Sequence, residues 1–213
     1  MKNRTSSLQT SLTVLFTSCF LISNVLAAKQ FALPFGISMT GAVIIFPITY
    51  ILSDLFSEVY GYAWSRKTCY MAFLMNLLMV GAFQLAIILP SASFWQGQEA
   101  FKATLGSTPR ILFASLIAYV IGDFANDKVF AKMKAKHETT LKGFGARAIL
   151  SSFVGEVCDS CIFIPLAFAG TMPLKALVIM GITQTMLKVT YETLILPVTK
   201  LCTRKVLEYE RGC

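Results

Sequence analysis

Six stretches of this chain are long and apolar enough to cross a lipid bilayer as helices. The hydrocarbon core needs about 20 residues of α-helix, and glycine or proline marks the breaks between the stretches, as at Gly61, Pro90 and Pro173. Charged residues make up only 14% of the chain, whereas a soluble domain has about 25%. We therefore predict an all-α membrane protein, with residues 1–213 forming one transmembrane domain, a single bundle of six transmembrane helices. Their expected bounds are about 8–28, 38–61, 68–90, 108–127, 147–170 and 174–200.

Lysine and arginine gather in alternate connecting segments, which predicts the orientation of the bundle. Fourteen of these residues fall on one side of the predicted membrane and four on the other. The positive-inside rule places the richer side in the cytoplasm, so both termini are expected there. The net charge of +8 then reflects membrane topology. Nucleic-acid binding is not expected, because no basic stripe is interleaved with aromatic residues.

The first apolar stretch has a second interpretation. Lys2 and Arg4 precede it and Ala27-Ala28 end it, as in a cleaved signal peptide. The stretch is longer than the apolar region of a typical signal peptide, and Asn24 is unusual in such a region. We therefore expect a retained helix.

Cysteine and histidine usage argues against a metal or another cofactor. Cys158 and Cys161 form a single CxxC, with no second pair and no histidine nearby, whereas a structural zinc site needs about four ligands. The chain's one histidine, His137, lies in a basic loop, and no serine lies beside a base. We expect no metal site, no cofactor, no catalytic residue and no enzyme activity.

Acidic residues inside the apolar stretches are the strongest functional signal. A charge at the bilayer centre costs roughly 2.5–3.5 kcal/mol on insertion scales, so such groups face a bundle interior or a wet cavity and bind something. Six of the eleven acidic residues lie inside the apolar stretches, together with Lys188, and a seventh, Asp127, is the last residue of the predicted span 108–127. This predicts that the protein binds or moves a polar solute within the membrane. The six are Asp54, Glu58, Asp123, Glu156, Asp159 and Glu192.

Helical spacing arranges four of these acids in two pairs. Asp54 and Glu58 are one turn apart on one face, and Glu156 and Asp159 share a face at i, i+3. Two like charges close together in a poor dielectric require a retained proton, a cation or a donor-rich partner. We interpret both pairs as substrate-binding groups.

The remaining polar residues in the spans have structural alternatives. Lys188 and Glu192, at i, i+4, could form an internal ion pair, or Lys188 could offset the acidic pairs or contact the ligand. Asp123, close to Lys128, could mark the cytoplasmic boundary. Asn76 could join neighbouring helices through its amide. These alternatives stay open at the level of sequence.

The same residues indicate the chemistry of the ligand. A planar heterocycle rich in N–H groups suits them, because a guanine-like edge offers two adjacent N–H groups that one carboxylate accepts together. Amides and Lys188 could meet its carbonyl and ring nitrogen, and aromatic rings could stack on its face. A calcium or magnesium site would need no lysine. A coupling proton is a further alternative for one carboxylate.

Three blocks of the sequence resemble the queuosine precursor transporter family, also called the vitamin uptake transporter family. They are residues 46–62, 109–134 and 147–170, and Ser23-Asn24-Val-Leu-Ala27 matches the first helix of the family. The resemblance covers nearly the whole chain in the right order. The chain departs from the family pattern at Glu156 and Asp123, where Gln and Glu are more usual.

The resemblance implies a bacterial inner-membrane importer of 7-deazaguanines. These are the 7-cyano and 7-aminomethyl precursors of queuosine, or the base queuine, which are salvaged for tRNA modification. Transport would proceed by alternating access around the buried carboxylates. The added charge of Glu156 would suit a cationic side chain on the base. The alternative is a substrate-capture subunit of a multicomponent vitamin or heterocycle importer, which needs ATPase partners.

The expected partners are therefore a small-molecule 7-deazaguanine and the lipid bilayer, with no nucleic acid, and a homo-oligomer is left open. The predicted substrate-binding residues are Asn24, Asp54, Glu58, Asn76, Glu156, Asp159, Lys188 and Glu192.

Overall fold

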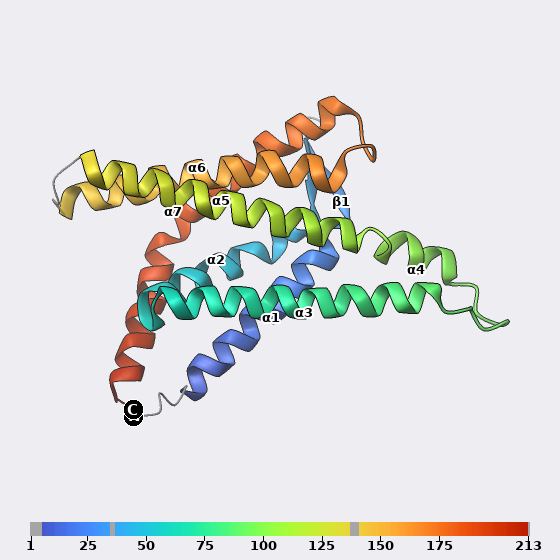
Figure 1. Ribbon diagram of the computed structural model, residues 1–213, viewed down its shortest axis with the longest axis horizontal. Helices are drawn as coiled ribbons and strands as arrows, with labels where there is room; N and C mark the ends of the chain where they lie inside the picture. Colours follow the sequence, from blue (N-terminus) through green and yellow to red (C-terminus); the bar gives the residue numbers. More distant parts are fainter. Residues whose placement is uncertain (1–5, 35–36, 137–140, 213) are drawn as a thin grey trace. The chain divides into compact units, whose positions relative to one another are not determined.

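The computed structural model describes residues 6–34, 37–136 and 141–212, although the side chains of some helical residues in these ranges, among them Asp123 and Glu192, lie outside the description. Within these ranges the chain forms seven α-helices, one two-stranded sheet and two short helical turns of other types (Figure 1). Apart from the short sheet, the regular structure is helical, in agreement with the predicted class. The predicted His137 loop falls outside the described residues.

The elements belong to two compact units. Unit 1 comprises Met1–Phe31, Thr40–Pro109 and Tyr191–Cys213, and unit 2 comprises Ala32–Met39 and Arg110–Thr190. Helix α7 (Leu174–Gly212) contributes its first part to unit 2 and its last part to unit 1. The strands β1 (Gln30–Leu33) and β2 (Ile37–Thr40) pair with each other.

Unit 1 is held together by aromatic packing around α1. Phe16 contacts Phe56 with ring centroids 5.8 Å apart, and Phe20 contacts Phe73 at 4.9 Å. Leu52 joins this core from α2, so helices distant in sequence share one apolar cluster. The helical elements of unit 1 are α1 (Ser7–Leu26), η2 (Gly41–Ile44), α2 (Phe46–Leu55), η3 (Phe56–Tyr60), α3 (Tyr62–Ile88), α4 (Gln98–Leu105) and the end of α7.

A hydrogen-bond network also ties the two ends of unit 1 to its middle. The carboxylate of Glu210, near the end of α7, accepts hydrogen bonds from the hydroxyls of Ser6 and Tyr60. Ser6 is at the same time the N-cap of α1, where its hydroxyl accepts the backbone N–H of Gln9 at 2.9 Å. The network therefore joins α1, η3 and α7.

In unit 2, α5 (Thr108–Lys136) and α6 (Leu141–Phe168) lie side by side with the first part of α7 (Figure 1). Arg110, near the start of α5, donates to the carbonyls of Leu166 and Ala169 at 2.6 and 2.7 Å. These carbonyls lie at the end of α6, where a cation is favoured and the last backbone acceptors need donors. Gly170 then leaves the helix with φ of 82°.

One predicted span is wrong in its secondary structure. The structure divides the expected helix over 38–61 among β2, η2, α2 and η3. Thr40 belongs to the hairpin, and Gly41 donates its backbone N–H to the carbonyl of Lys29 at 2.7 Å. Pro47 lies in the first turn of α2, where its missing N–H costs nothing. Hydropathy alone did not reveal these breaks, because the segment is apolar throughout.

The other predicted boundaries shift in both directions: α1, α3 and α6 each end two residues before the predicted span does. Helix α3 begins at Tyr62 directly after Gly61, whose φ of 85° and ψ of 158° are accessible mainly to glycine. Helices α5 and α7 end after their predicted spans, α6 begins before its span, and α4 forms between the predicted spans 68–90 and 108–127. Glu99 in the first turn of α4 and Lys102 in its last match the helix dipole.

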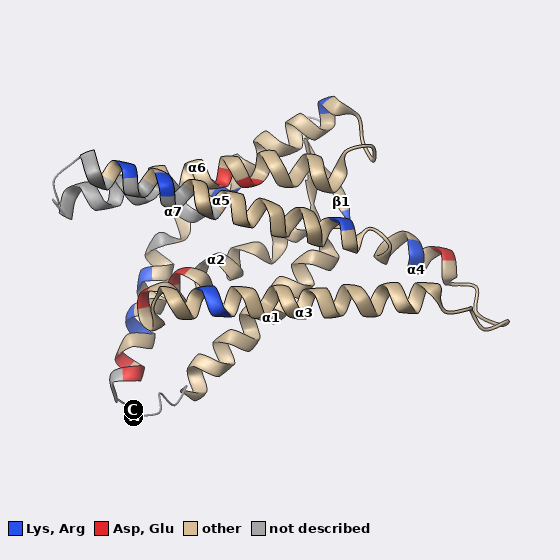
Figure 2. Cartoon of the chain, in the orientation of Figure 1, with Lys and Arg blue, Asp and Glu red and all other residues tan. Residues whose placement is uncertain are grey.

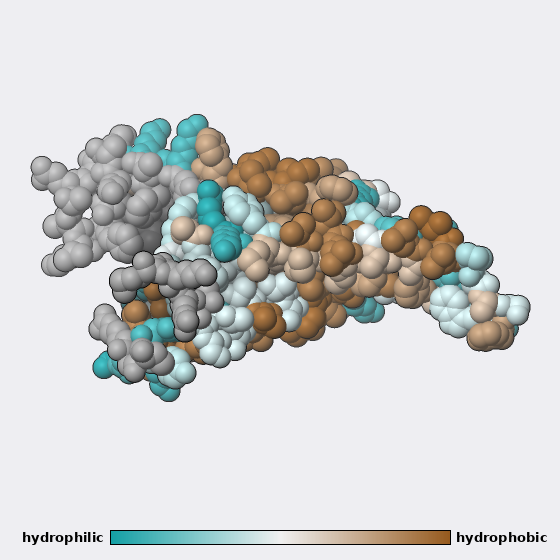
Figure 3. All heavy atoms as spheres, turned by 60° about the horizontal axis from the view of Figure 1, so that its bottom comes forward, coloured by the Kyte–Doolittle hydropathy of each residue, from teal (hydrophilic) through white to brown (hydrophobic). Residues whose placement is uncertain are grey.

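Three helical stretches are long and apolar enough to cross a membrane in the part of the chain that the structure describes. They are Ser7–Leu26, Tyr62–Ile88 and Gln98–Gly122. Large apolar side chains are exposed along these helices, and Figure 3 shows apolar residues over much of the face in view. A lipid environment would cover such surface. The count of six spans and the cytoplasmic location of both termini stay predictions.

Candidate functional site

The predicted acidic pair of α6 meets a lysine from α7. The ammonium of Lys188 lies 2.5 Å from the Oδ2 atom of Asp159 and 2.9 Å from the Oε2 atom of Glu156. The Lys188 side chain is only 11% exposed, and those of Glu156 and Asp159 are 18% and 25% exposed. A mostly buried cation thus bridges two mostly buried carboxylates. Figure 2 shows acidic positions in the middle of α6.

Helical periodicity and close packing together build this cluster. Glu156 and Asp159 share one face of α6, and a glycine brings α5 close to that face. A Cβ atom at Gly122 of α5 would lie 3.0 Å from the carbonyl oxygen of Gly155 and 3.2 Å from the Cβ atom of Asp159. The absence of a side chain at residue 122 therefore allows the backbones of α5 and α6 to approach this closely.

Two buried polar residues extend the cluster along both helices. Gln184 precedes Lys188 by one turn of α7, and Ser160 follows Glu156 by one turn of α6. Both are more than nine-tenths buried. The Gln184 Oε1 and Ser160 Oγ atoms have no hydrogen-bond partner among the side chains and backbone groups that the structure describes. Because buried polar atoms are nearly always paired, these acceptors are candidates for ligand contacts.

In unit 1, two predicted amides are buried in the helix packing. Asn24 of α1 is 6% exposed and Asn76 of α3 is 0% exposed. The Nδ2 atoms of both residues, and the Oδ1 atom of Asn76, lack a hydrogen-bond partner within the described ranges. These amides therefore do not act as a closed interhelical pair in this conformation.

Thr68 is a residue that the sequence interpretation missed. It lies two turns before Asn76 on the same buried face of α3, is 0% exposed, and has a hydroxyl oxygen without a described partner. Its i, i+8 spacing from Asn76 in an apolar helix is a signal that could have identified it.

The second predicted acidic pair has a different environment. Asp54 of α2 and Glu58 of η3 are both exposed residues of unit 1. No ion pair joins either carboxylate to a side chain placed in the structure. The Lys188 cluster belongs to unit 2, whereas Asp54 and Glu58 belong to unit 1. Glu192, also a predicted site residue, has its side chain outside the description, and its pairing with Lys188 stays a prediction.

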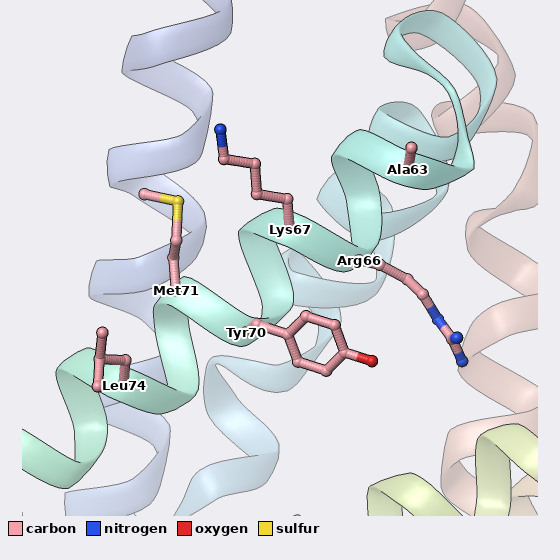
Figure 4. A pocket seen from close by; sticks show the side chains of 6 residues that line it. All are labelled: Ala63, Arg66, Lys67, Tyr70, Met71 and Leu74. Atoms are coloured by element: carbon pink, nitrogen blue, oxygen red, sulfur yellow. The ribbon is translucent and has the colours of Figure 1, made fainter.

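A groove of about 380 Å³ runs along one face of α3, lined by side chains from that helix alone (Figure 4). Its lining combines two cations with apolar groups, and it contains none of the predicted site residues. A cationic groove does not suit a base rich in N–H donors, so we do not assign it as the substrate site. The lining residues are Ala63, Arg66, Lys67, Tyr70, Met71 and Leu74.

Comparison with known proteins agrees with the sequence resemblance. The family model described as "Putative vitamin uptake transporter" matches residues 40–202. A protein of Bacillus subtilis (strain 168) named "Probable queuosine precursor transporter" is 23% identical over 182 residues, which cover 84% of this chain and 77% of the relative. No solved structure matches the chain. The family match extends over well more than half of the sequence, so this chain belongs to the vitamin uptake transporter family and is a membrane transport protein rather than an enzyme.

Proposed function

We propose that this protein imports queuosine precursors across a bacterial inner membrane for tRNA modification. The substrates would be 7-cyano-7-deazaguanine, 7-aminomethyl-7-deazaguanine or queuine. The name of the Bacillus subtilis relative supports this substrate class. The observation that carries the proposal is the pair of mostly buried carboxylates, Glu156 and Asp159, bridged by Lys188 inside an apolar helical unit.

The chemistry of the cluster matches the functional groups of these bases. A carboxylate can accept two adjacent N–H groups of a guanine-like edge, and charge-assisted hydrogen bonds of this kind are short and strong. An aminomethyl or queuine side chain adds an ammonium group, for which Glu156 and Asp159 are suitable partners. Glu156 would thereby favour the cationic bases over the neutral cyano compound.

Unit 1 carries the other predicted substrate-binding groups, for which we propose contacts with the base during the transport cycle. Asp54 or Glu58 would accept the N–H edge of the base, and the buried amides of Asn24 and Asn76 would meet its carbonyl and ring nitrogen. The substrate would pass the site by alternating access, in a bundle of six spans with both termini in the cytoplasm. Such a site explains why carboxylates persist in apolar segments.

Binding to purified protein tests the substrate class. The panel contains guanine, the cyano and aminomethyl deazaguanines, queuine and unrelated vitamins. We expect saturable binding of at least one deazaguanine, at higher affinity than any vitamin. A folded sample that binds no deazaguanine would contradict the proposal.

Uptake into liposomes separates the proposal from a substrate-capture subunit. The purified protein alone should accumulate the bound deazaguanine inside the vesicles. Binding without uptake would favour the capture subunit, which transports only with ATPase partners.

A further inference from the structure

We infer that Lys188 is an internal substitute for the substrate's ammonium group, and that it occupies the carboxylates whenever the transporter is empty. The inference rests on the proposed function, because it concerns how the same site operates through a transport cycle. It assigns Lys188 to the return of the empty transporter rather than to recognition of the base.

The geometry of the cluster supports competition between lysine and substrate. The Lys188 ammonium of α7 contacts one carboxylate oxygen of Glu156 and one of Asp159, both on α6. A substrate ammonium placed between the same carboxylates would need the same position. Two cations do not share such a position, so substrate binding displaces Lys188.

The structure also offers a second location for the displaced ammonium. The Gln184 Oε1 and Ser160 Oγ atoms are buried acceptors without described partners, one helical turn from Lys188 and Glu156 respectively. A lysine side chain in a helix leans toward the N-terminus, which here is the direction of Gln184. Its flexible stem and three donors allow it to exchange one set of acceptors for the other.

The electrostatic consequence concerns the empty transporter. Two ionised carboxylates without a cation would be strongly disfavoured in a closed, low-dielectric site, so the empty protein would pass through the occluded state slowly. Lys188 supplies that cation in the absence of substrate. A protein without Lys188 should therefore change its orientation readily only with a cationic substrate bound.

This leads to a test that separates two transport modes in proteoliposomes. Net uptake requires the empty protein to return, whereas exchange of labelled for unlabelled substrate does not. With the full-length protein and an aminomethyl deazaguanine or queuine, we expect Lys188→Met to lower net uptake at least about tenfold while exchange stays within about threefold of the unmodified protein.

Three variants serve as controls. Lys188→Arg retains the cation and should support both modes. Lys175→Met removes an exposed lysine from the start of the same helix and should leave both modes unchanged. The double variant Glu156→Gln/Lys188→Met removes one carboxylate with the cation, and it should regain part of the net uptake even if Lys188→Met alone folds poorly.

The outcomes distinguish this inference from the proposed function. If the unmodified protein transports the substrate and Lys188→Met loses exchange and net uptake equally, without recovery in the double variant, the inference is wrong and the proposed function stands. Unchanged net uptake by Lys188→Met would overturn it as well. If the unmodified, folded protein moves no deazaguanine in either mode, the proposed function fails, and the inference fails with it.

Discussion

The two acidic pairs of this protein look alike in sequence but differ in environment. Asp54 and Glu58 of unit 1 are exposed and have no ion pair to a described side chain. Glu156 and Asp159 of unit 2 are mostly buried and share the ammonium of Lys188. Both spacings place two carboxylates on one helix face, so the spacing does not decide the role of a pair. The difference arises from what the neighbouring helix presents to that face.

Removing each pair in turn should produce the largest contrast. Glu156→Leu/Asp159→Leu takes both carboxylates from the buried Lys188 ammonium, and we expect a loss of unfolding free energy of about 3–5 kcal/mol. Asp54→Leu/Glu58→Leu should change it by less than about 1 kcal/mol, as for exposed charges. Denaturant unfolding in detergent micelles measures both. Equal losses would show that the two pairs do not differ as described.

A smaller effect is expected on substrate selectivity. Glu156→Gln keeps the shape of the side chain but removes its charge, so it should weaken the transport of aminomethyl deazaguanine or queuine relative to the cyano compound. Hydrogen bonds to charged groups contribute about 1.5–3 kcal/mol, which corresponds to a change in the uptake ratio of about tenfold or more. An unchanged ratio in competition uptake would show that the charge of Glu156 does not determine this selectivity. The matched variant Glu58→Gln tests whether a carboxylate of unit 1 contributes to the selectivity.

Close packing beside the buried pair gives the next prediction. Gly122→Ala places a Cβ atom 3.0 Å from the backbone oxygen of Gly155, and we expect a destabilisation of about 1–3 kcal/mol from overpacking. Uptake should fall because Asp159 lies against the same contact. Gly181→Ala is the matched control, since a Cβ atom at Gly181 meets nothing within 4 Å. Similar unfolding midpoints for the two variants would argue against a close α5–α6 contact.

The buried amide of unit 1 should produce the smallest change in stability. Asn76→Leu removes polar atoms that lack described partners, so the free energy of unfolding should change by no more than about 1 kcal/mol. Deazaguanine binding should nevertheless weaken. A clear loss of stability with unchanged binding would instead assign Asn76 to helix–helix adhesion.

Parts of the fold were predictable because they depend on local composition. The first span, 8–28, corresponds to α1 at Ser7–Leu26. Residues 68–88 of the predicted span 68–90 lie in α3. The breaks inside 38–61 were not predictable from hydropathy. They depend on the backbone pairing of Gly41 with Lys29 and on the start of α2 around Pro47, neither of which changes the apolar character of the segment.

The sequence by itself determined the membrane class, the spacing of the acidic pairs and the family, because apolar length, residue spacing and motif order are properties of the chain. Only the tertiary structure decided which cation meets which acid. It placed Lys188 between Glu156 and Asp159, left Asp54 and Glu58 exposed, and buried Gln184 and Ser160 beside the cluster. The physical reason is that contacts between helices depend on how closely their backbones pack, as at Gly122, and this distance is not encoded in the spacing along either helix.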